Sequence, residues 1–107
     1  MEAAEAQYLY LTTKGRRSGL PREIEIWFTC HQGRCYVIAE YGTSQWVQNV
    51  QADARVRVRV GEKSFDATAR VILAEREPEA QSAVQQLSQK KYGWGEGLVI
   101  ELAPDRC

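Results

Sequence analysis

A basic turn contains the densest group of residues that could bind a ligand. From residue 14 to residue 22 the sequence reads Lys-Gly-Arg-Arg-Ser-Gly-Leu-Pro-Arg, with four cations and no acidic side chain. Its glycines and proline predict a turn rather than a helix or a central strand. Arginine forks and a serine hydroxyl donate well to phosphate or carboxylate oxygens, and glycine lets the backbone approach a ligand closely. We therefore predict an anion-binding cradle formed by Lys14, Arg16, Arg17, Ser18, Gly19 and Arg22.

A solvated surface turn is the alternative interpretation of this stretch. Charge runs in turns are usually exposed to water and carry no ligand. The chain has 14 basic and 14 acidic residues, so its formal net charge is zero and the positive charge is local. A dedicated nucleic-acid binder is usually basic overall, so nucleic acid is not expected as a partner. Ligand binding and simple solvation both stay open on the residues alone.

The cysteines and the single histidine were considered as a metal or disulfide site. Cys30, Cys35 and Cys107 are odd in number and fit no disulfide framework. His31 lies between the first two, but no second cluster supplies a fourth metal ligand. No metal site is predicted. Cys30 and Cys35 are expected to lie near each other across a hairpin as reduced packing residues.

Composition indicates one globular domain over residues 1–107. The chain is 44% hydrophobic and 26% charged, as in ordinary soluble proteins. Its first residues, Met-Glu-Ala-Ala-Glu-Ala, contain no apolar run, and no stretch is long enough to span a bilayer. We therefore expect a cytoplasmic protein without stable membrane insertion, which leaves peripheral membrane association open.

Strands are predicted on both sides of the basic turn. Residues 8–13 read Tyr-Leu-Tyr-Leu-Thr-Thr and alternate with a period of two. Alternation resumes after the turn and reaches a hairpin centred on Gln32–Gly33, with residues 35–40 as the return strand. This register would place Ile26 opposite Ala39.

A second hairpin is predicted further along the chain. Residues 55–60 alternate arginine and valine, and residues 64–72 form the predicted partner strand. A turn centred on Glu62–Lys63 would pair Arg59 with Asp66, which is a favourable pair of opposite charges. The arginines are therefore interpreted as structural pairs on a solvent-exposed sheet face.

Two helices complete the predicted elements. A short helix over residues 45–52 would place Trp46 and Asn49 on one side, and a longer helix covers residues 77–91. A last strand is predicted at residues 98–103. Six strands with hairpin links and two helices predict a mainly β (α+β) protein, either a small barrel or a strongly bent sheet with helices packed at its ends.

Three segments resemble the deazaflavin-dependent nitroreductase family. They are Leu-Thr-Thr-Lys-Gly-Arg-Arg-Ser-Gly-Leu-Pro-Arg at residues 11–22, Tyr-Val-Ile-Ala at residues 36–39, and Trp46-x-x-Asn49. That family belongs to the split β-barrel flavin-binding superfamily, which includes pyridoxamine-phosphate oxidase-like proteins. The resemblance covers roughly residues 8–72. It implies a six-stranded antiparallel split β-barrel with two packed helices, and a homodimer.

The resemblance also implies a coenzyme and a reaction. Members of the family use coenzyme F-420 (hereafter F420), an 8-hydroxy-5-deazaflavin with a phosphate and a polyglutamate tail. They transfer a hydride from the reduced coenzyme to an electron-poor acceptor such as a quinone, an activated alkene or a nitroaromatic. The polyanionic tail would give the basic turn its ligand, since charge-assisted hydrogen bonds are strong. In this interpretation the coenzyme carries the chemistry and the protein orients it.

The family pattern assigns further residues to the deazaflavin ring. The end of the predicted strand at residues 35–40 would lie against the ring, and two residues of the short helix would lie near it. These positions are Ala39, Glu40, Tyr41, Gly42, Trp46 and Asn49. Tyr92 and Trp94 match acceptor-side aromatic positions, and Tyr92 is predicted as the catalytic residue that donates a proton to the product.

Other interpretations of these residues remain. Trp46 and Tyr92 could be packing residues, and Asn49 could bond the nearby backbone. The loop at residues 40–45, which would touch the ring, is shorter than the family pattern predicts. A second hypothesis keeps the fold and replaces F420 with FMN, FAD or haem. A non-catalytic coenzyme carrier, or a barrel that binds single-stranded nucleic acid through the arginines of residues 55–60, is a third possibility.

Overall fold

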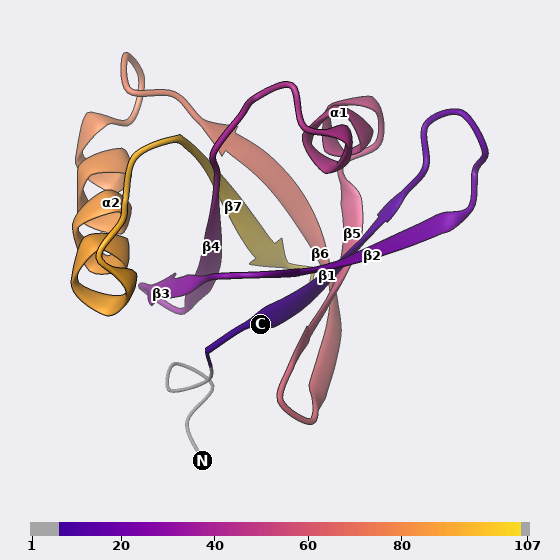
Figure 1. The fold of residues 1–107 in the computed structure, drawn as a ribbon, viewed down its shortest axis with the longest axis horizontal. Helices are drawn as coiled ribbons and strands as arrows, with labels where there is room; N and C mark the ends of the chain where they lie inside the picture. Colours follow the sequence, from indigo (N-terminus) through magenta and orange to yellow (C-terminus); the bar gives the residue numbers. More distant parts are fainter. Residues whose placement is uncertain (1–6, 106–107) are drawn as a thin grey trace.

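The computed structural model describes residues 7–105 and consists of one curled sheet with two helices (Figure 1). The elements are β1 (Leu9–Lys14), β2 (Pro21–Ile26), β3 (Thr29–His31), β4 (Arg34–Ala39), α1 (Gln45–Ala52), β5 (Arg55–Val60), β6 (Lys63–Ile72), α2 (Pro78–Tyr92) and β7 (Leu98–Pro104). The strand order is β2-β1-β5-β6-β7-β4-β3, and every neighbouring pair is antiparallel. The predicted fold class is confirmed, although the sheet has seven strands instead of six.

The additional strand arises from a break after β2. β2 pairs with β1 and β3 pairs with β4, so the short link at Trp27–Phe28 joins the two edges of the sheet. Ile26 consequently lies opposite Leu9, and the predicted pairing of Ile26 with Ala39 is wrong. Phe28 is only 1% exposed, so the link is anchored in the core. This switch of edges curls the sheet into a barrel, as Figure 1 shows.

The register of the second hairpin also differs from the prediction. Val60 pairs with Lys63, so the turn consists of Gly61 and Glu62, and Gly61 has φ +60°. Glycine adopts this conformation without a steric penalty. The strands are therefore shifted by two residues, and Arg57 rather than Arg59 pairs with Asp66, with 2.8 Å between guanidinium and carboxylate. A shift of two residues leaves each side chain on its predicted face.

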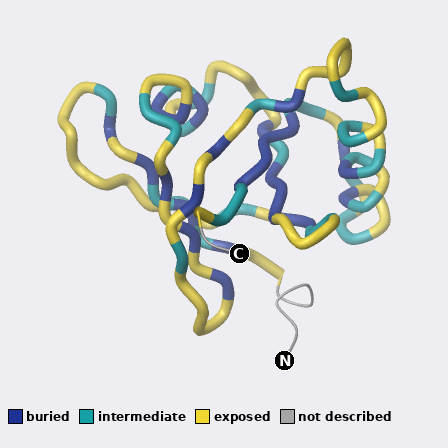
Figure 2. The backbone as a smooth tube through the Cα atoms, turned by 180° about the vertical axis from the view of Figure 1, so that it is seen from behind, coloured by how far each residue is buried: buried dark blue, intermediate teal, exposed yellow. Residues whose placement is uncertain are grey.

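Buried and exposed residues alternate along the strands, and the buried ones form the core inside the curl (Figure 2). β5 illustrates the pattern, because its three valines are buried and its three arginines are exposed. α1 closes one part of this core with Val47 and Val50, while Val84 of α2 packs in a second, smaller cluster. Burying apolar surface in this way supplies most of the favourable free energy of folding. Among residues 7–105, no helix has the length and apolar character needed to cross a membrane.

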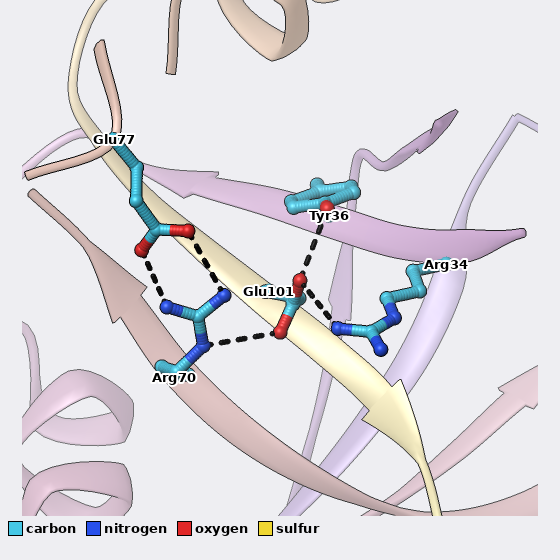
Figure 3. A network of polar contacts seen from close by, with 5 residues as sticks. All are labelled: Arg34, Tyr36, Arg70, Glu77 and Glu101. Carbon is cyan, nitrogen blue, oxygen red and sulfur yellow. Dashed lines mark hydrogen bonds and ion pairs between the residues drawn. The ribbon is translucent and has the colours of Figure 1, made fainter. Parts of the chain in front are cut away.

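A buried carboxylate connects three strands to the start of α2 (Figure 3). Glu101 of β7 is 4% exposed and accepts hydrogen bonds from Arg34 (3.0 Å), Tyr36 (3.1 Å) and Arg70 (3.2 Å). Arg70 also pairs with Glu77, the residue that precedes α2. Burial alone would raise the pKa of Glu101, but these donors outweigh it and lower that pKa. The network therefore fixes α2 against the outer face of the sheet.

Candidate functional site

A cavity of about 780 Å³ opens between the Trp27–Phe28 link, the end of β4 and the start of α1. This volume is within the range of small-molecule sites, about 300–1,000 Å³. The walls come from separate segments and are mostly apolar or aromatic. They include residues 25–29 and 38–41, together with Tyr8, Tyr36, Ser44, Trp46, Ser88 and Trp94. A flat aromatic ligand would find both apolar walls and a few polar groups here.

Two glycines place Trp94 at the cavity. A Cβ at Gly95 would lie 2.2 Å from a backbone oxygen of α2, and a Cβ at Gly97 would lie 2.4 Å from the carbonyl oxygen of Ala39. Only glycine permits the loop at residues 93–97 to contact both α2 and the end of β4. Ser88 fixes the loop further by donating a hydrogen bond of 2.6 Å to the carbonyl of Trp94.

Tyr92 supports the opposite wall of the cavity. Its ring stacks on Trp27 with a centroid distance of 4.4 Å and an interplanar angle of 3°. The backbone N–H of Phe28 donates to the Tyr92 hydroxyl (3.1 Å), and that hydroxyl lies within hydrogen-bond distance of the carbonyls of Gln7 and Phe28, at 2.8 and 2.9 Å. Tyr92 is not among the residues that line the cavity. These contacts give it a positioning role, and its proton-donor role stays a prediction.

Thr29 carries a buried hydroxyl that has no hydrogen-bond partner among residues 7–105. The residue is 5% exposed and lines the cavity. Leaving a buried hydroxyl unpaired costs about 1–3 kcal/mol, and such groups are rare in native proteins. Thr29 also lines a second, smaller cavity, so a polar atom of a ligand in either cavity could satisfy this hydroxyl.

The basic turn is a closed loop between β1 and β2. The N–H of Gly15 donates to the carbonyl of Leu20 (2.8 Å), and the N–H of Gly19 donates to the carbonyl of Gly15 (2.7 Å). The N–H of Leu20 donates to the Ser18 hydroxyl (3.1 Å), which leaves the hydroxyl proton free to donate. The loop thus holds its backbone in one shape without using its cationic side chains.

The cations of this turn are not neutralised within the described chain. Lys14, Arg17 and Arg22 are exposed, and residues 7–105 place no carboxylate within 4.0 Å of their charged groups. Their side chains do not line the 780 Å³ cavity. They form a separate positive surface that an anionic group could approach from solvent.

Asn49 of α1 connects the basic turn to the helix that borders the cavity. Its side-chain oxygen accepts hydrogen bonds from the backbone N–H (3.2 Å) and the guanidinium (2.9 Å) of Arg16. Its amide nitrogen donates to the hydroxyl of Thr13 (3.2 Å), and the residue is 5% exposed. Trp46, less than one turn earlier on the helix, lines the cavity. Figure 1 shows α1 between the loop that follows β4 and the loop between β1 and β2.

The structure thus divides the predicted site residues into groups. Four of them line the cavity, namely Ala39, Glu40, Tyr41 and Trp46. Gly42 follows them in the same loop but does not line the cavity. Six residues form the positive turn on the other side of α1, and Asn49 joins this turn to the helix. The ring contact predicted for Asn49 stays a prediction, because its amide is engaged by Arg16 and Thr13.

Trp27 and Thr29 are among the residues of the cavity wall that the sequence analysis did not find. Trp27 is 40% exposed. The available signal was an exposed tryptophan, since large exposed aromatic side chains often mark binding surfaces. Thr29 gave no signal in the sequence.

Each arginine of β5 has an acidic partner. Arg55 pairs with Asp53 at 3.0 Å, Arg57 with Asp66 at 2.8 Å, and Arg59 with Glu23 at 4.0 Å. Arg59 also lies over the ring of Tyr10, 4.2 Å from its centroid. These pairings agree with the structural interpretation of the arginine stripe and do not favour a nucleic-acid surface.

Comparison with known proteins relates this chain to one family. The sequence model of the F420H2-dependent quinone reductase family matches residues 2–95. A solved F420-H2 dependent reductase, FDR-A, is 23% identical with a TM-score of 0.74 and covers 90% of this chain and 93% of its own. A structure described as a domain-swapped dimer is 22% identical with a TM-score of 0.72, covering 91% and 79%. The haem-storage protein HutZ of Vibrio cholerae is 17% identical with a TM-score of 0.79, covering 98% and 86%.

Proposed function

Because this chain belongs to the F420H2-dependent quinone reductase family, we propose that the cavity and the basic turn are two parts of one F420 site. The protein is an F420-dependent reductase that acts on an electron-poor acceptor, as the sequence predicts. When bound, the reduced coenzyme supplies the hydride, and the protein supplies binding, orientation and exclusion of water. The acceptor and the contacts of individual residues are proposals.

The observation that carries this assignment is the bridge between Arg16 and Asn49 across α1. It attaches a positive surface without acidic partners in the described chain to the helix whose Trp46 lines the aromatic cavity. A coenzyme with a flat ring at one end and a polyanionic tail at the other matches this pair of surfaces. Neither surface alone would distinguish F420 from a simple anion or a simple aromatic ligand.

In this arrangement the basic turn binds the phosphate and the carboxylates of the tail. Lys14, Arg17 and Arg22 supply the charges, Ser18 supplies a hydroxyl proton, and Gly19 keeps the loop in its closed shape. Arg16 is held by Asn49, so one edge of the turn cannot move away from α1. The turn therefore acts as a preorganised anion site, which reduces the entropic cost of binding.

The cavity would hold the deazaflavin ring and the acceptor together. Ala39, Glu40, Tyr41 and Gly42 border the ring on one side, as the family resemblance implies, and Trp46 borders it on another. Trp27 and Trp94 form aromatic walls that exclude water from the reacting atoms. The Thr29 hydroxyl, which has no partner in the described chain, would donate to a carbonyl of the ring or of the acceptor.

We also propose an acceptor and an oligomeric state, from the family's name and from the exposed aromatic residues of the cavity. We propose a quinone as one acceptor because the family model bears that name, with activated alkenes and nitroaromatics as alternatives. Tyr8, Trp27 and Tyr41 line the cavity and are 40–63% exposed, so a second subunit would cover apolar surface there. We therefore propose a homodimer, and its cytoplasmic location stays a prediction.

Binding of two ligands would test the division of the site. F420 and the deazaflavin riboside that lacks the phosphate and tail are titrated with protein and followed by fluorescence polarisation. Arg17→Gln and Arg22→Gln are each expected to weaken F420 binding about tenfold. This change corresponds to the lower end of the free-energy range of charged hydrogen bonds, because the site is exposed to solvent. Neither variant should change the affinity for the riboside.

Arg76→Gln is the matched control, because it removes an exposed arginine from the loop before α2. Its F420 affinity should equal that of the parent protein. If Arg17→Gln lost the same affinity for F420 and for the riboside, the turn would not bind the tail. Tighter binding of FMN than of F420 would instead support the flavin alternative, and a red or yellow protein as purified would point to haem or flavin.

A further inference from the structure

Two cysteines face each other across the hairpin of β3 and β4. Cys30 and Cys35 are directly paired, and both are free thiols. The turn has two residues, Gln32 (φ +52°) and Gly33 (φ +80°), so the pair His31–Arg34 closes it. Bonded and non-bonded pairs alternate along an antiparallel ladder, which makes Cys30–Cys35 a non-bonded pair with Cα atoms about 4.5 Å apart. Disulfides span Cα separations of about 4.4–6.8 Å, so these thiols can join without a large backbone movement.

The two thiols have different surroundings. Cys35 is buried, whereas Cys30 is partly exposed and opens into a second cavity of about 290 Å³. The charged groups that face Cys30 are Lys90 and Lys91 of α2, which line this cavity. Lys91 is held in place by a hydrogen bond of 2.9 Å to the carbonyl of Phe28. A small anionic molecule could therefore reach Cys30 but not Cys35.

The environment also separates the acidities of the two thiols. A hydrogen bond from Cys35 lowers the pKa of Cys30 to about 7, the charge of Lys91 acts in the same direction, and burial opposes both. The same hydrogen bond together with burial raises the pKa of Cys35. Cys30 is thus the thiolate of the pair near neutral pH, and thiolates are the nucleophiles of thiol chemistry.

We propose that Cys30 and Cys35 form a reversible dithiol–disulfide site in which Cys30 attacks a low-molecular-weight disulfide and Cys35 resolves the mixed disulfide. In the first step the Cys30 thiolate bonds to one sulfur of the small disulfide, and the other sulfur leaves as a thiolate. In the second step Cys35 loses its proton and its sulfur attacks Cys30, which releases the second small thiolate. Two protein thiols are oxidised to one disulfide, and the small disulfide is reduced to two thiols that take up the two protons.

This site differs from the proposed coenzyme site in its chemistry, although the two cavities adjoin at Thr29, which lines both. It neither requires F420 nor contributes a residue to the basic turn. A pair of thiols that only fills space in the core would not be joined by a small disulfide, so formation of the Cys30–Cys35 disulfide distinguishes the two interpretations. The site is thus tested on the free protein without coenzyme.

The experiment uses the full chain with Cys107→Ser, so that the third cysteine cannot exchange. The protein is incubated with glutathione disulfide, the remaining thiols are alkylated, and the product is digested with trypsin. Arg34 lies between the two cysteines, so cleavage after it separates their peptides unless a disulfide joins them. We expect a linked pair of peptides that reductant separates. Failure of this linked pair to form under excess glutathione disulfide would overturn the proposal.

Single variants in the same background test the order of attack. Cys35→Ser should accumulate a stable glutathione adduct on Cys30, and Cys30→Ser should react at least tenfold more slowly. In Cys35→Ala, which has no side-chain donor at position 35, the rate should rise with pH as Cys30 loses its proton, and it should reach its plateau at a higher pH than in the parent protein, because the hydrogen bond that lowers the pKa of Cys30 is absent. Equal rates for Cys35→Ser and Cys30→Ser would overturn the assignment of Cys30 as the attacking thiol.

Discussion

The contact between Arg16 and Asn49 allows the sharpest test of the two-part site. Asn49→Ala removes two hydrogen bonds to Arg16, one of them charge-assisted, and one hydrogen bond to Thr13. Neutral bonds contribute about 0.5–1.5 kcal/mol each and charged ones about 1.5–3 kcal/mol, so the variant should lose about 2.5–6 kcal/mol of unfolding free energy. That is a large part of the 5–15 kcal/mol typical of a small domain.

A milder variant keeps the experiment interpretable if Asn49→Ala fails to fold. Thr13→Val removes only the hydroxyl that accepts from Asn49 and leaves both hydrogen bonds between Asn49 and Arg16. It should lose about 1 kcal/mol of stability and bind F420 within about twofold of the parent protein.

A double-mutant cycle then decides what Asn49 does for coenzyme binding. If Asn49 acts by holding Arg16, the variant Arg16→Ala/Asn49→Ala should lose less binding free energy than the sum of the two single losses, because either substitution removes the guanidinium contact, while the N–H of residue 16 still donates to Asn49 in Arg16→Ala. If Asn49 contacts the coenzyme itself, the two losses of binding free energy should add within about 0.5 kcal/mol. Dissociation constants are measured by fluorescence polarisation in the absence of urea. The stability of each variant is measured separately by urea unfolding. Additive losses would refute the positioning role assigned to Asn49.

Three further variants test other parts of the structure. Gly95→Ala should lose about 1–3 kcal/mol of unfolding free energy, because its Cβ would lie 2.2 Å from a backbone oxygen. Gly42→Ala is the control: its Cβ would lie 3.9 Å from the nearest atom, so the unfolding free energy should change by less than about 0.5 kcal/mol. Glu101→Gln should be less stable than the parent above the usual glutamate pKa of 4.5, and urea titrations should show this difference shrinking as the pH falls through the lowered pKa of the folded state. Tyr92→Phe should lose about 1 kcal/mol of stability with an unchanged pH profile of kcat, because its hydroxyl bonds the link between β2 and β3; a changed profile would support proton donation.

The parts of the fold that depend on local sequence were predictable. The basic turn and the hairpin at Gln32–Gly33 follow from glycine placement, and both helices follow from the spacing of their apolar residues. The register of β5 and β6 was not predictable. Turns at Gly61–Glu62 and at Glu62–Lys63 leave every side chain on the same face of the sheet. Alternation with a period of two specifies a face and leaves a shift of two residues undetermined.

The break after β2 was invisible in the sequence for a related reason. Ile24, Ile26 and Phe28 continue one alternating pattern, although Ile26 belongs to one edge strand and Phe28 precedes the other. The change of edge depends on how the whole sheet curls, which no local pattern encodes. Since the cavity lies at this break, its residues Trp27 and Thr29 were missed with it. The contact of Arg16 with Asn49 spans 33 residues and was missed because only the assembled fold creates it.

The position of α1 explains why the two halves of the site can change independently. The helix presents Trp46 to the cavity and Asn49 to the basic turn, so each half contacts a different side chain of one rigid element. Charges in the turn determine how strongly an anionic tail binds, and this attraction is screened by salt. Aromatic walls determine which ring and which acceptor fit, and their contacts depend little on salt. Affinity for the tail should therefore fall as ionic strength rises while affinity for the tail-less riboside stays constant, because the cations of the turn, which have no carboxylate within 4.0 Å in the described chain, would contact only the tail.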